Sequence, residues 1–147
     1  MHRNPSDSEL RTLLTNARTV AVVGASNNTD RPVYGVMRRL QQVGYRVIPV
    51  NPREKEILGE RVYASLHDIP EHVDVVDVFR RAEFTPAIAE QAVAIKAGAL
   101  WLQQGISNEE TAAIARAGGL TVVMDLCMAV EHSLLQIPRR QASPRDT

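Results

Sequence analysis

The chain has 147 residues, the length of one domain with a substantial buried core. Its 17 Lys and Arg residues balance its 17 Asp and Glu residues, so no overall basic field indicates nucleic-acid binding. No apolar run approaches the ~20 residues that span a bilayer, and the polar segment 1–7 lacks the apolar stretch of a signal peptide. Cys127 is the only cysteine, which excludes an internal disulfide and favours a reducing cytoplasm.

Short apolar runs alternate with helical patterns along the whole chain. Ser6 and Glu9 have the spacing of a capping box and open a first amphipathic helix, and Ser107 and Glu110 have the same spacing before a later one. Pro49 places the second strand at an edge of the sheet or at its own end. The expected strands are 19–23, 46–50, 73–79, 99–102 and 121–124, and the expected later helices are 33–43, 85–96, 107–118 and 128–136.

This alternation predicts right-handed crossovers and therefore a parallel sheet. The fold class is α/β: a Rossmann-like three-layer domain with a mainly parallel sheet of about five strands. We expect the domain to occupy residues 1–138 and residues 139–147 to form a disordered tail.

The turn after the first strand has the features of a phosphate-binding turn. Gly24 permits a tight turn, Ala25 follows it, and Ser26 offers a hydroxyl. Arg31 precedes a proline-started helix whose N-terminus favours an anion. The alternative is that Gly24 only turns a corner and Ser26 caps a helix.

The end of the second strand narrows the choice of nucleotide. An NAD site would place a carboxylate there to accept from the ribose hydroxyls. This chain has Val50, Asn51, Pro52 and Arg53 instead. A base without an acid suits a phosphorylated ribose, which means NADP or coenzyme A.

Two further strand ends carry candidate binding residues. Phe79 and Arg80 follow the third strand, where the guanidinium group would reach a pyrophosphate and the ring would cover an adenine or a pantetheine arm. Asp77 is expected to brace an arginine or a helix start. Gln103 and Gly105 follow the fourth strand and are expected to line the same crevice.

In order, these stretches resemble the small coenzyme A-binding proteins of the bacterial CoA-binding domain family, the stand-alone YccU-like group. The fold is similar to the nucleotide-binding domain of the succinyl-CoA synthetase alpha subunit. The resemblance covers roughly residues 8 to 132 and rests on the stretches 22–26, 30–32, 44–52, 76–80, 100–105 and 123–127. It implies noncovalent binding of CoA, with phosphates at the turn after the first strand and the adenosine end beside residues 50–52.

No residue is assigned a catalytic role, and no histidine has metal-ligand spacing with Cys127. We hypothesise that Cys127, which follows the fifth strand, forms a mixed disulfide with the thiol of bound CoA under oxidation. The alternative is an inert core cysteine.

Three functions remain open at this point. The leading one is a CoA- or acyl-CoA-binding module with a carrier, sensor or regulatory role rather than an enzymatic one. The others are an NADP-dependent oxidoreductase and a non-catalytic interaction protein with a vestigial nucleotide site. We expect a small-molecule partner, no nucleic acid and no membrane, and an apolar helix face would allow a homodimer.

Overall fold

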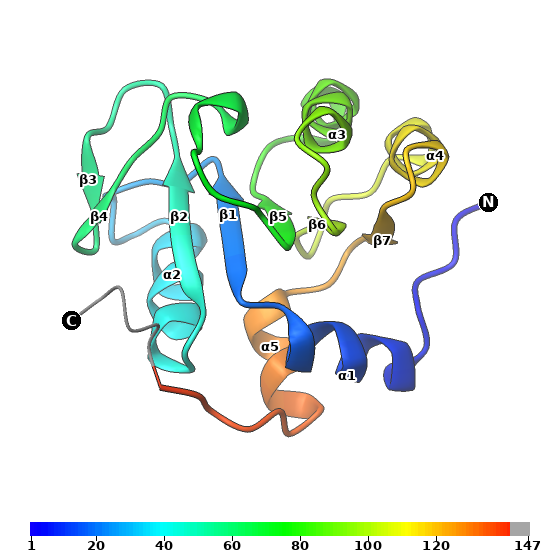
Figure 1. Ribbon diagram of the computed structural model, residues 1–147, viewed down its shortest axis with the longest axis horizontal. Helices are drawn as coiled ribbons and strands as arrows, with labels where there is room; N and C mark the ends of the chain where they lie inside the picture. Colours follow the sequence, from blue (N-terminus) through cyan, green and yellow to red (C-terminus); the bar gives the residue numbers. More distant parts are fainter. Residues whose placement is uncertain (142–147) are drawn as a thin grey trace.

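The protein is a single parallel sheet covered by helices on both faces (Figure 1). The computed structural model describes residues 1–141. The strands of the main sheet are β1 (Thr19–Val23), β2 (Arg46–Val50), β5 (Val75–Val78), β6 (Ala99–Leu102) and β7 (Thr121–Val123). The helices are α1 (Asp7–Asn16), α2 (Pro32–Gln42), α3 (Thr85–Ala94), α4 (Glu109–Ala117) and α5 (Met128–Leu134).

The five strands are all parallel and lie in the order β2-β1-β5-β6-β7. The chain therefore moves outward from β1 to β2, returns across β1 to β5, and then continues in the other direction. This is the doubly wound order in which ligands bind where the winding reverses, here between β1 and β5. The predicted fold class is confirmed, and Pro49 does lie on an edge strand.

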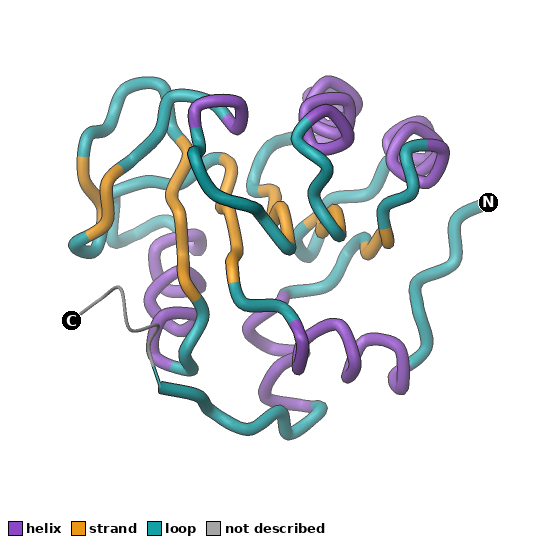
Figure 2. Tube along the Cα trace, in the orientation of Figure 1, coloured by secondary structure: helices purple, strands orange, loops and turns teal. Residues whose placement is uncertain are grey.

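Two apolar cores lie on opposite faces of the sheet. On one face, α1, α2 and α5 bury side chains such as Leu14, Met37 and Met128. On the other face, α3 and α4 bury small side chains such as Ala89 and Ala115, which bring these helices close to the strands. Figures 1 and 2 show the same two helix layers with the strands between them.

The segment between β2 and β5 departs from the simple alternation. It forms a small antiparallel hairpin of β3 (Glu56–Ile57) and β4 (Glu60–Arg61), followed by a short 3-10 helix, η1 (Leu66–Asp68). A second 3-10 helix, η2 (Ala82–Phe84), joins β5 to α3. The sequence predicted none of these three features.

The start of α4 also differs from its prediction. The N-cap is Asn108, whose side-chain oxygen accepts from the Thr111 amide at 3.1 Å, so the expected capping box of Ser107 and Glu110 is wrong. The first capping box, of Ser6 and Glu9, is present in both directions.

The packed part of the chain extends beyond residue 138. Arg140 donates a backbone hydrogen bond to the Val43 carbonyl and side-chain hydrogen bonds to the Thr15 and Ala17 carbonyls, which ties this segment to the ends of α1 and α2. The rest of the expected tail, residues 142–147, lies outside the described residues. Within residues 1–141, no helix combines the length and apolar character needed to cross a membrane.

Candidate functional site

A cleft of about 850 Å³ opens at the carboxyl ends of β2, β1 and β5. Its lining comes from the loops that follow these three strands, from η1 and from one side of α3. The cleft therefore lies at the reversal of the winding, where the fold predicts a ligand site.

Gly24 brings the first two of these loops together. It has a φ of +88°, and a β-carbon at this position would lie 2.5 Å from the Phe79 carbonyl oxygen. Its amide and that of Ala25 both donate to the Val50 carbonyl, at 3.2 and 3.3 Å. The positive φ agrees with the tight turn that the sequence predicted, and Gly24 is required in addition for close packing of the β1 turn against the β5 loop.

The remainder of the turn is held by side chains. The Ser26 hydroxyl accepts from the Asn28 amide at 3.0 Å, and the Asn27 side chain donates to the Glu54 carboxylate at 2.7 Å. Among the described residues, the amides of Ser26 and Asn27 have no hydrogen-bond partner. These two amides, rather than those of Gly24 and Ala25, are the donors that the turn can offer to an anion.

Asn51 links the turn to the loop after β2. Its side-chain amide donates to the Ala25 carbonyl at 2.7 Å, and its side-chain oxygen accepts from the Arg53 amide at 2.7 Å. With both ends of the side chain engaged, Asn51 positions the two loops. Asn51 and its neighbours Val50, Pro52 and Arg53 all line the cleft.

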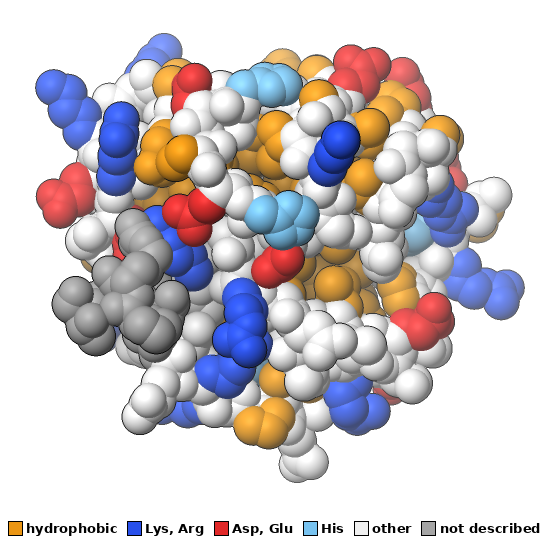
Figure 3. All heavy atoms as spheres, viewed as in Figure 1, with side chains coloured by type: hydrophobic (Ala, Val, Ile, Leu, Met, Phe, Trp, Pro, Cys, Tyr) orange, Lys and Arg blue, Asp and Glu red, His pale blue; other side chains and the backbone are white. Residues whose placement is uncertain are grey.

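Four arginines line the cleft: Arg31, Arg53, Arg80 and Arg81. Within the described part of the chain, no Asp or Glu side chain lines it. The chain as a whole has a net charge of +0, and on the face seen in Figure 3 charges of both signs are spread over the surface. The cleft is therefore a local concentration of positive charge on a protein without an overall basic field.

One wall of the cleft is largely apolar and comes from η1, which the sequence did not predict, and from α3 with the residue before it, which the sequence analysis did not assign to the site. Leu66 of η1 and Ile88 of α3 are buried, and Phe84 and Gln91 complete the α3 side. Phe84, Ile88 and Gln91 are spaced i, i+4 and i+7, which is one face of a helix. That spacing is the signal in the sequence that could have found this wall.

The chain matches a known family over most of its length. The CoA binding domain family matches residues 18–133. The chain belongs to the CoA-binding domain family. This CoA-binding domain is 41% identical to the uncharacterized protein YneT of Bacillus subtilis over 132 residues, which are 90% of this chain and 98% of that protein. Membership in the family supports binding of CoA in general, and thus of a small molecule.

Two further relatives are a protein of similar length and a much longer ligase that contains a similar domain. A solved structure of a hypothetical protein from Pyrococcus horikoshii has a TM-score of 0.88 at 37% identity, covering 92% of this chain and 98% of that one. The ADP-forming acetate–CoA ligase II of Archaeoglobus fulgidus is 35% identical over 95 residues, which are 63% of this chain but 14% of the ligase. The recognised family and its relation to acyl-CoA synthetase domains are thus confirmed.

The CoA-binding domain does not bring all its predicted site residues together. Gln103 and Gly105 do not line the cleft. The Gly105 amide donates to the Asp125 carboxylate at 2.6 Å, so this glycine belongs to a contact between the loops after β6 and β7. The Gln103 side chain is 8% exposed, and its oxygen has no hydrogen-bond partner among the described residues.

Asp77 is fully buried in the middle of β5, between Val22 of β1 and Trp101 of β6. Neither carboxylate oxygen has a hydrogen-bond partner among residues 1–141, so the expectation that Asp77 braces an arginine or a helix start is wrong. Burial raises the pKa of Asp77 to about 8, because the charged form loses its hydration without gaining a partner. Asp77 is therefore a neutral acid at pH 7.

Two other residues with reactive side chains lie away from the cleft. Cys127 is 8% exposed and packs in the core on the α5 face. The mixed disulfide between Cys127 and CoA is not tested by these contacts and stays a prediction. His132 is buried on α5 beside Tyr45, with ring centroids 5.7 Å apart, and burial lowers its pKa. In the described residues, no group of three His, Cys, Asp or Glu side chains could hold a metal ion.

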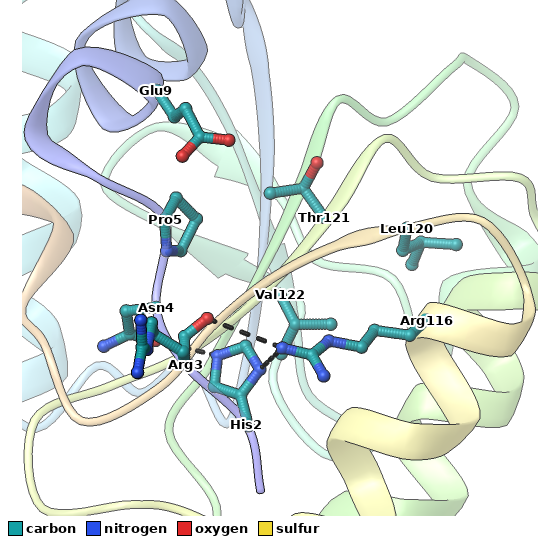
Figure 4. A pocket seen from close by; sticks show the side chains of 9 residues that line it. All are labelled: His2, Arg3, Asn4, Pro5, Glu9, Arg116, Leu120, Thr121 and Val122. Carbon is teal, nitrogen blue, oxygen red and sulfur yellow. Dashed lines mark hydrogen bonds between the residues drawn. The ribbon is translucent and has the colours of Figure 1, made fainter.

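A smaller hollow of about 340 Å³ lies between the N-terminal segment and β7 (Figure 4). Arg116, one of the residues that line it, contacts the His2 ring at 2.6 Å and the Arg3 carbonyl at 3.5 Å. The Asn4 side chain donates to the Met124 carbonyl and accepts from the Met124 amide, both at 2.8 Å. These contacts explain the hollow as the junction between the N-terminal segment and the edge of the sheet.

Proposed function

We propose that the protein binds CoA or an acyl-CoA noncovalently in the cleft at the ends of β2, β1 and β5. We place the phosphates against the turn after β1 and the arginines around it. In this proposal the protein is a cytoplasmic carrier, sensor or regulator of CoA and performs no catalysis of its own.

The observation that carries the proposal is the set of four arginines around a cleft that no carboxylate of residues 1–141 lines. Guanidinium groups form charge-assisted, often bidentate hydrogen bonds with phosphate oxygens. CoA carries a diphosphate and a 3′-phosphate, and a phosphomonoester contributes a charge of about −1.5 to −2 at pH 7. The unpartnered amides of Ser26 and Asn27 add neutral donors at the same place.

The residues of the loop after β2 favour a ligand whose ribose carries a phosphate. Asn51 and Arg53 occupy the position where an NAD site needs a carboxylate. The nearest acid, Glu54, accepts from the Asn27 side chain. An NADP-dependent oxidoreductase is the second candidate on this ground, and family membership favours CoA over it.

Isothermal titration calorimetry with CoA, acetyl-CoA, NADP and NAD tests the proposal. We expect CoA and acetyl-CoA to bind with similar affinity, because the phosphates and not the acyl end carry the interaction. Tighter binding of NADP would favour the oxidoreductase. Absence of binding by all four ligands would support an interaction protein whose cleft has lost its ligand.

A further inference from the structure

Three polar atoms in the interior have no hydrogen-bond partner. They are Oδ1 and Oδ2 of Asp77 and Oε1 of Gln103, and among residues 1–141 they are the only buried side-chain nitrogen or oxygen atoms in this condition. A buried polar atom without a partner is costly. An ionised carboxylate oxygen and an amide oxygen both accept hydrogen bonds and do not donate them, so what this part of the core lacks is a donor.

Asp77 and Gln103 lie on the same face of the sheet. Asp77 pairs with Trp101 across the neighbouring strands β5 and β6 (Figure 1). The Gln103 amide donates to the Val78 carbonyl at 3.2 Å, so the ladder continues one residue past β6 and the Gln103 side chain lies on the same face as that of Trp101. Gln103 is therefore a diagonal neighbour of Asp77. Diagonal neighbours on one face of a sheet are roughly 7–8 Å apart, a distance that a long side chain spans.

Protonation of Asp77 supplies the missing donor. Burial keeps the proton on Asp77 at pH 7, and a carboxylic acid donates through its O–H group. The Asp77 side chain exposes no surface to water, so the acceptor for this proton has to be an atom of the protein. Gln103 Oε1 is an acceptor on the same face that is buried and has no donor of its own.

No charged group of the surrounding elements acts on this proton. Burial is the only cause of the raised pKa of Asp77. Helices α1, α2 and α5 cover this face of the sheet, and the charged residues of α1 are all exposed. The other titratable side chains that are buried or half-buried on this face, or on the helices that cover it, are Tyr34, Arg39, Tyr45, Cys127, Glu131 and His132.

The opposite end of the Gln103 amide faces outward. Its Nε2 atom makes no hydrogen bond among the described residues, yet it does not belong to the buried atoms that lack a partner, so it is in contact with solvent. An amide has a donor at one end and an acceptor at the other. The last torsion of a glutamine side chain is soft, and a half turn about it exchanges the two ends.

We propose that Asp77 and Gln103 form a proton-controlled switch. While Asp77 carries its proton, its O–H group donates to Oε1 of Gln103, and the NH2 group of Gln103 faces outward. When the proton leaves to solvent, the amide makes a half turn, Nε2 donates to the carboxylate, and Oε1 faces outward. The surface at the end of β6 thereby changes from a hydrogen-bond donor to a hydrogen-bond acceptor.

The switch lies outside the arginine-lined cleft and does not rest on the proposed function. Gln103 is the first residue after β6, and its carbonyl accepts from the Ile106 amide at 2.9 Å, so it anchors the loop that leads to α4. One neutral amide donor replaces only part of the hydration that a buried carboxylate loses, which agrees with a pKa of about 8 for Asp77. A single proton therefore sets which group the root of this loop offers at the surface.

NMR spectroscopy of the ligand-free protein tests the switch directly. The side-chain amide signal of Gln103 is assigned by its absence in Gln103→Met and is followed through pH values on both sides of about 8. We expect it to shift with the same midpoint as the carboxyl carbon of Asp77. In Asp77→Asn, whose amide is a permanent donor to Oε1, the Gln103 signal should not move with pH.

Hydrogen exchange separates rotation of the amide from a simple effect of nearby charge. Gln104 is the next residue and is exposed, so its side-chain amide is the internal control. The exchange rate of the Gln103 NH2 group relative to that of Gln104 should fall several-fold above the midpoint, because Nε2 then points inward. A Gln103 signal that does not respond to Asp77, or that shifts with no change in relative exchange, would overturn the proposal.

A double-mutant cycle measures the bond between the two side chains below the midpoint. Gln103→Met removes the acceptor and Asp77→Leu removes the donor. If the two side chains are bonded, Gln103→Met should raise the unfolding equilibrium constant about 2- to 150-fold more in the wild-type background than in the Asp77→Leu background. Gln104→Met is the matched control and should have the same small effect in both. Equal effects of Gln103→Met in the two backgrounds would mean that Asp77 and Gln103 do not interact.

Discussion

The carboxyl edge of the sheet has two places where neighbouring loops diverge to opposite faces. One is between β1 and β5, where α2 and α3 lie on different faces, and the other is between β6 and β7, where α4 and α5 do. The first is the arginine-lined cleft. The second is closed, because the Asp125 carboxylate accepts from the Gly105 amide at 2.6 Å and the Asp125 amide donates to the Ile106 carbonyl.

The two places differ in how the backbone amides at their strand ends obtain a hydrogen-bond acceptor. Backbone amides at strand ends need an acceptor, and a helix or strand end without one is costly when buried. Between β6 and β7 the protein supplies its own carboxylate. Between β1 and β5 it supplies cations instead, and we propose that a ligand phosphate supplies the acceptor.

The two glycines that begin these loops give the largest contrast. Gly24 and Gly105 have similar φ values, +88° and +87°, but only a β-carbon at Gly24 would meet neighbouring atoms within 4 Å. Gly24→Ala should lower the free energy of unfolding by about 2–5 kcal/mol, from positive-φ strain plus a steric clash. Gly105→Ala should cost about 1–2 kcal/mol from strain alone.

Chemical denaturation of both variants measures this contrast. Equal losses would mean that the approach of Gly24 to Phe79 stores little energy and that the two turns are energetically alike.

Removal of a cleft cation should affect binding and not folding. Arg80→Gln is expected to weaken CoA by about 1.5–3 kcal/mol, the cost of one charge-assisted hydrogen bond. Arg38→Gln is the matched control, because Arg38 is exposed on α2 and does not line the cleft. Calorimetry at one fixed salt concentration compares them, and a similar loss in both variants would indicate a general charge effect.

Asp125→Ala tests the role of the Asp125 carboxylate, which closes the gap between the loops after β6 and β7. The variant loses the acceptor for Gly105 and places alanine at a φ of +61°, so unfolding should become about 1–2 kcal/mol easier. CoA affinity should stay unchanged, because Asp125 does not line the cleft. A large loss of affinity would show that the two places are coupled.

Burial of Asp77 should make the free energy of unfolding depend on pH. Its pKa of about 8 in the folded protein exceeds the ~3.9 of an unfolded chain, so between these values the folded state binds a proton that the unfolded state does not. The stability that this group contributes is complete below pH ~4 and declines as pH rises toward 8. Asp77→Asn removes the dependence, so the free energy of unfolding of the variant relative to the wild type should rise by about 1.4 kcal/mol per pH unit between pH 5 and 7.

Urea denaturation of both proteins at pH 5, 7 and 9 provides the test, since the other titrating groups cancel in the difference. A difference that does not grow with pH would show that Asp77 ionises normally or has a partner.

Much of this architecture was predictable because each strand is a short apolar run bounded by turn residues. The same regularity placed the residues after β1, β2 and β5 at one edge. Gly105 met the same criteria but lies outside the cleft, because its amide donates to the carboxylate of Asp125, twenty residues further along. Gln103 met them too, but it is buried and does not line the cleft. Sequence order alone does not show which strand ends are closed by such contacts.

The features that the sequence did not predict have local physical reasons. The β3–β4 turn holds Leu58 and Gly59 at φ values of 51° and 79°, and leucine is a poor signal for a left-handed position. The wall formed by Phe84, Ile88 and Gln91 comes from the end of η2 and from α3 rather than from a strand end. Ile88 and Gln91 lie in the predicted helix 85–96 and Phe84 just before it, and the sequence analysis gave none of them a role in the site although the i, i+4, i+7 spacing was visible.

Both outer strands of the sheet are protected against pairing with another chain. On β2, Pro49 has no amide to donate, and its carbonyl accepts from the Tyr63 amide at 3.1 Å. Directly after β7, the Asn4 side chain donates to the Met124 carbonyl and accepts from the Met124 amide, as the backbone of an adjacent strand would. Unpaired edges are templates for aggregation. Deletion of the first four residues should therefore turn this protein into one that self-associates at high concentration, even though its cleft and both its cores remain intact.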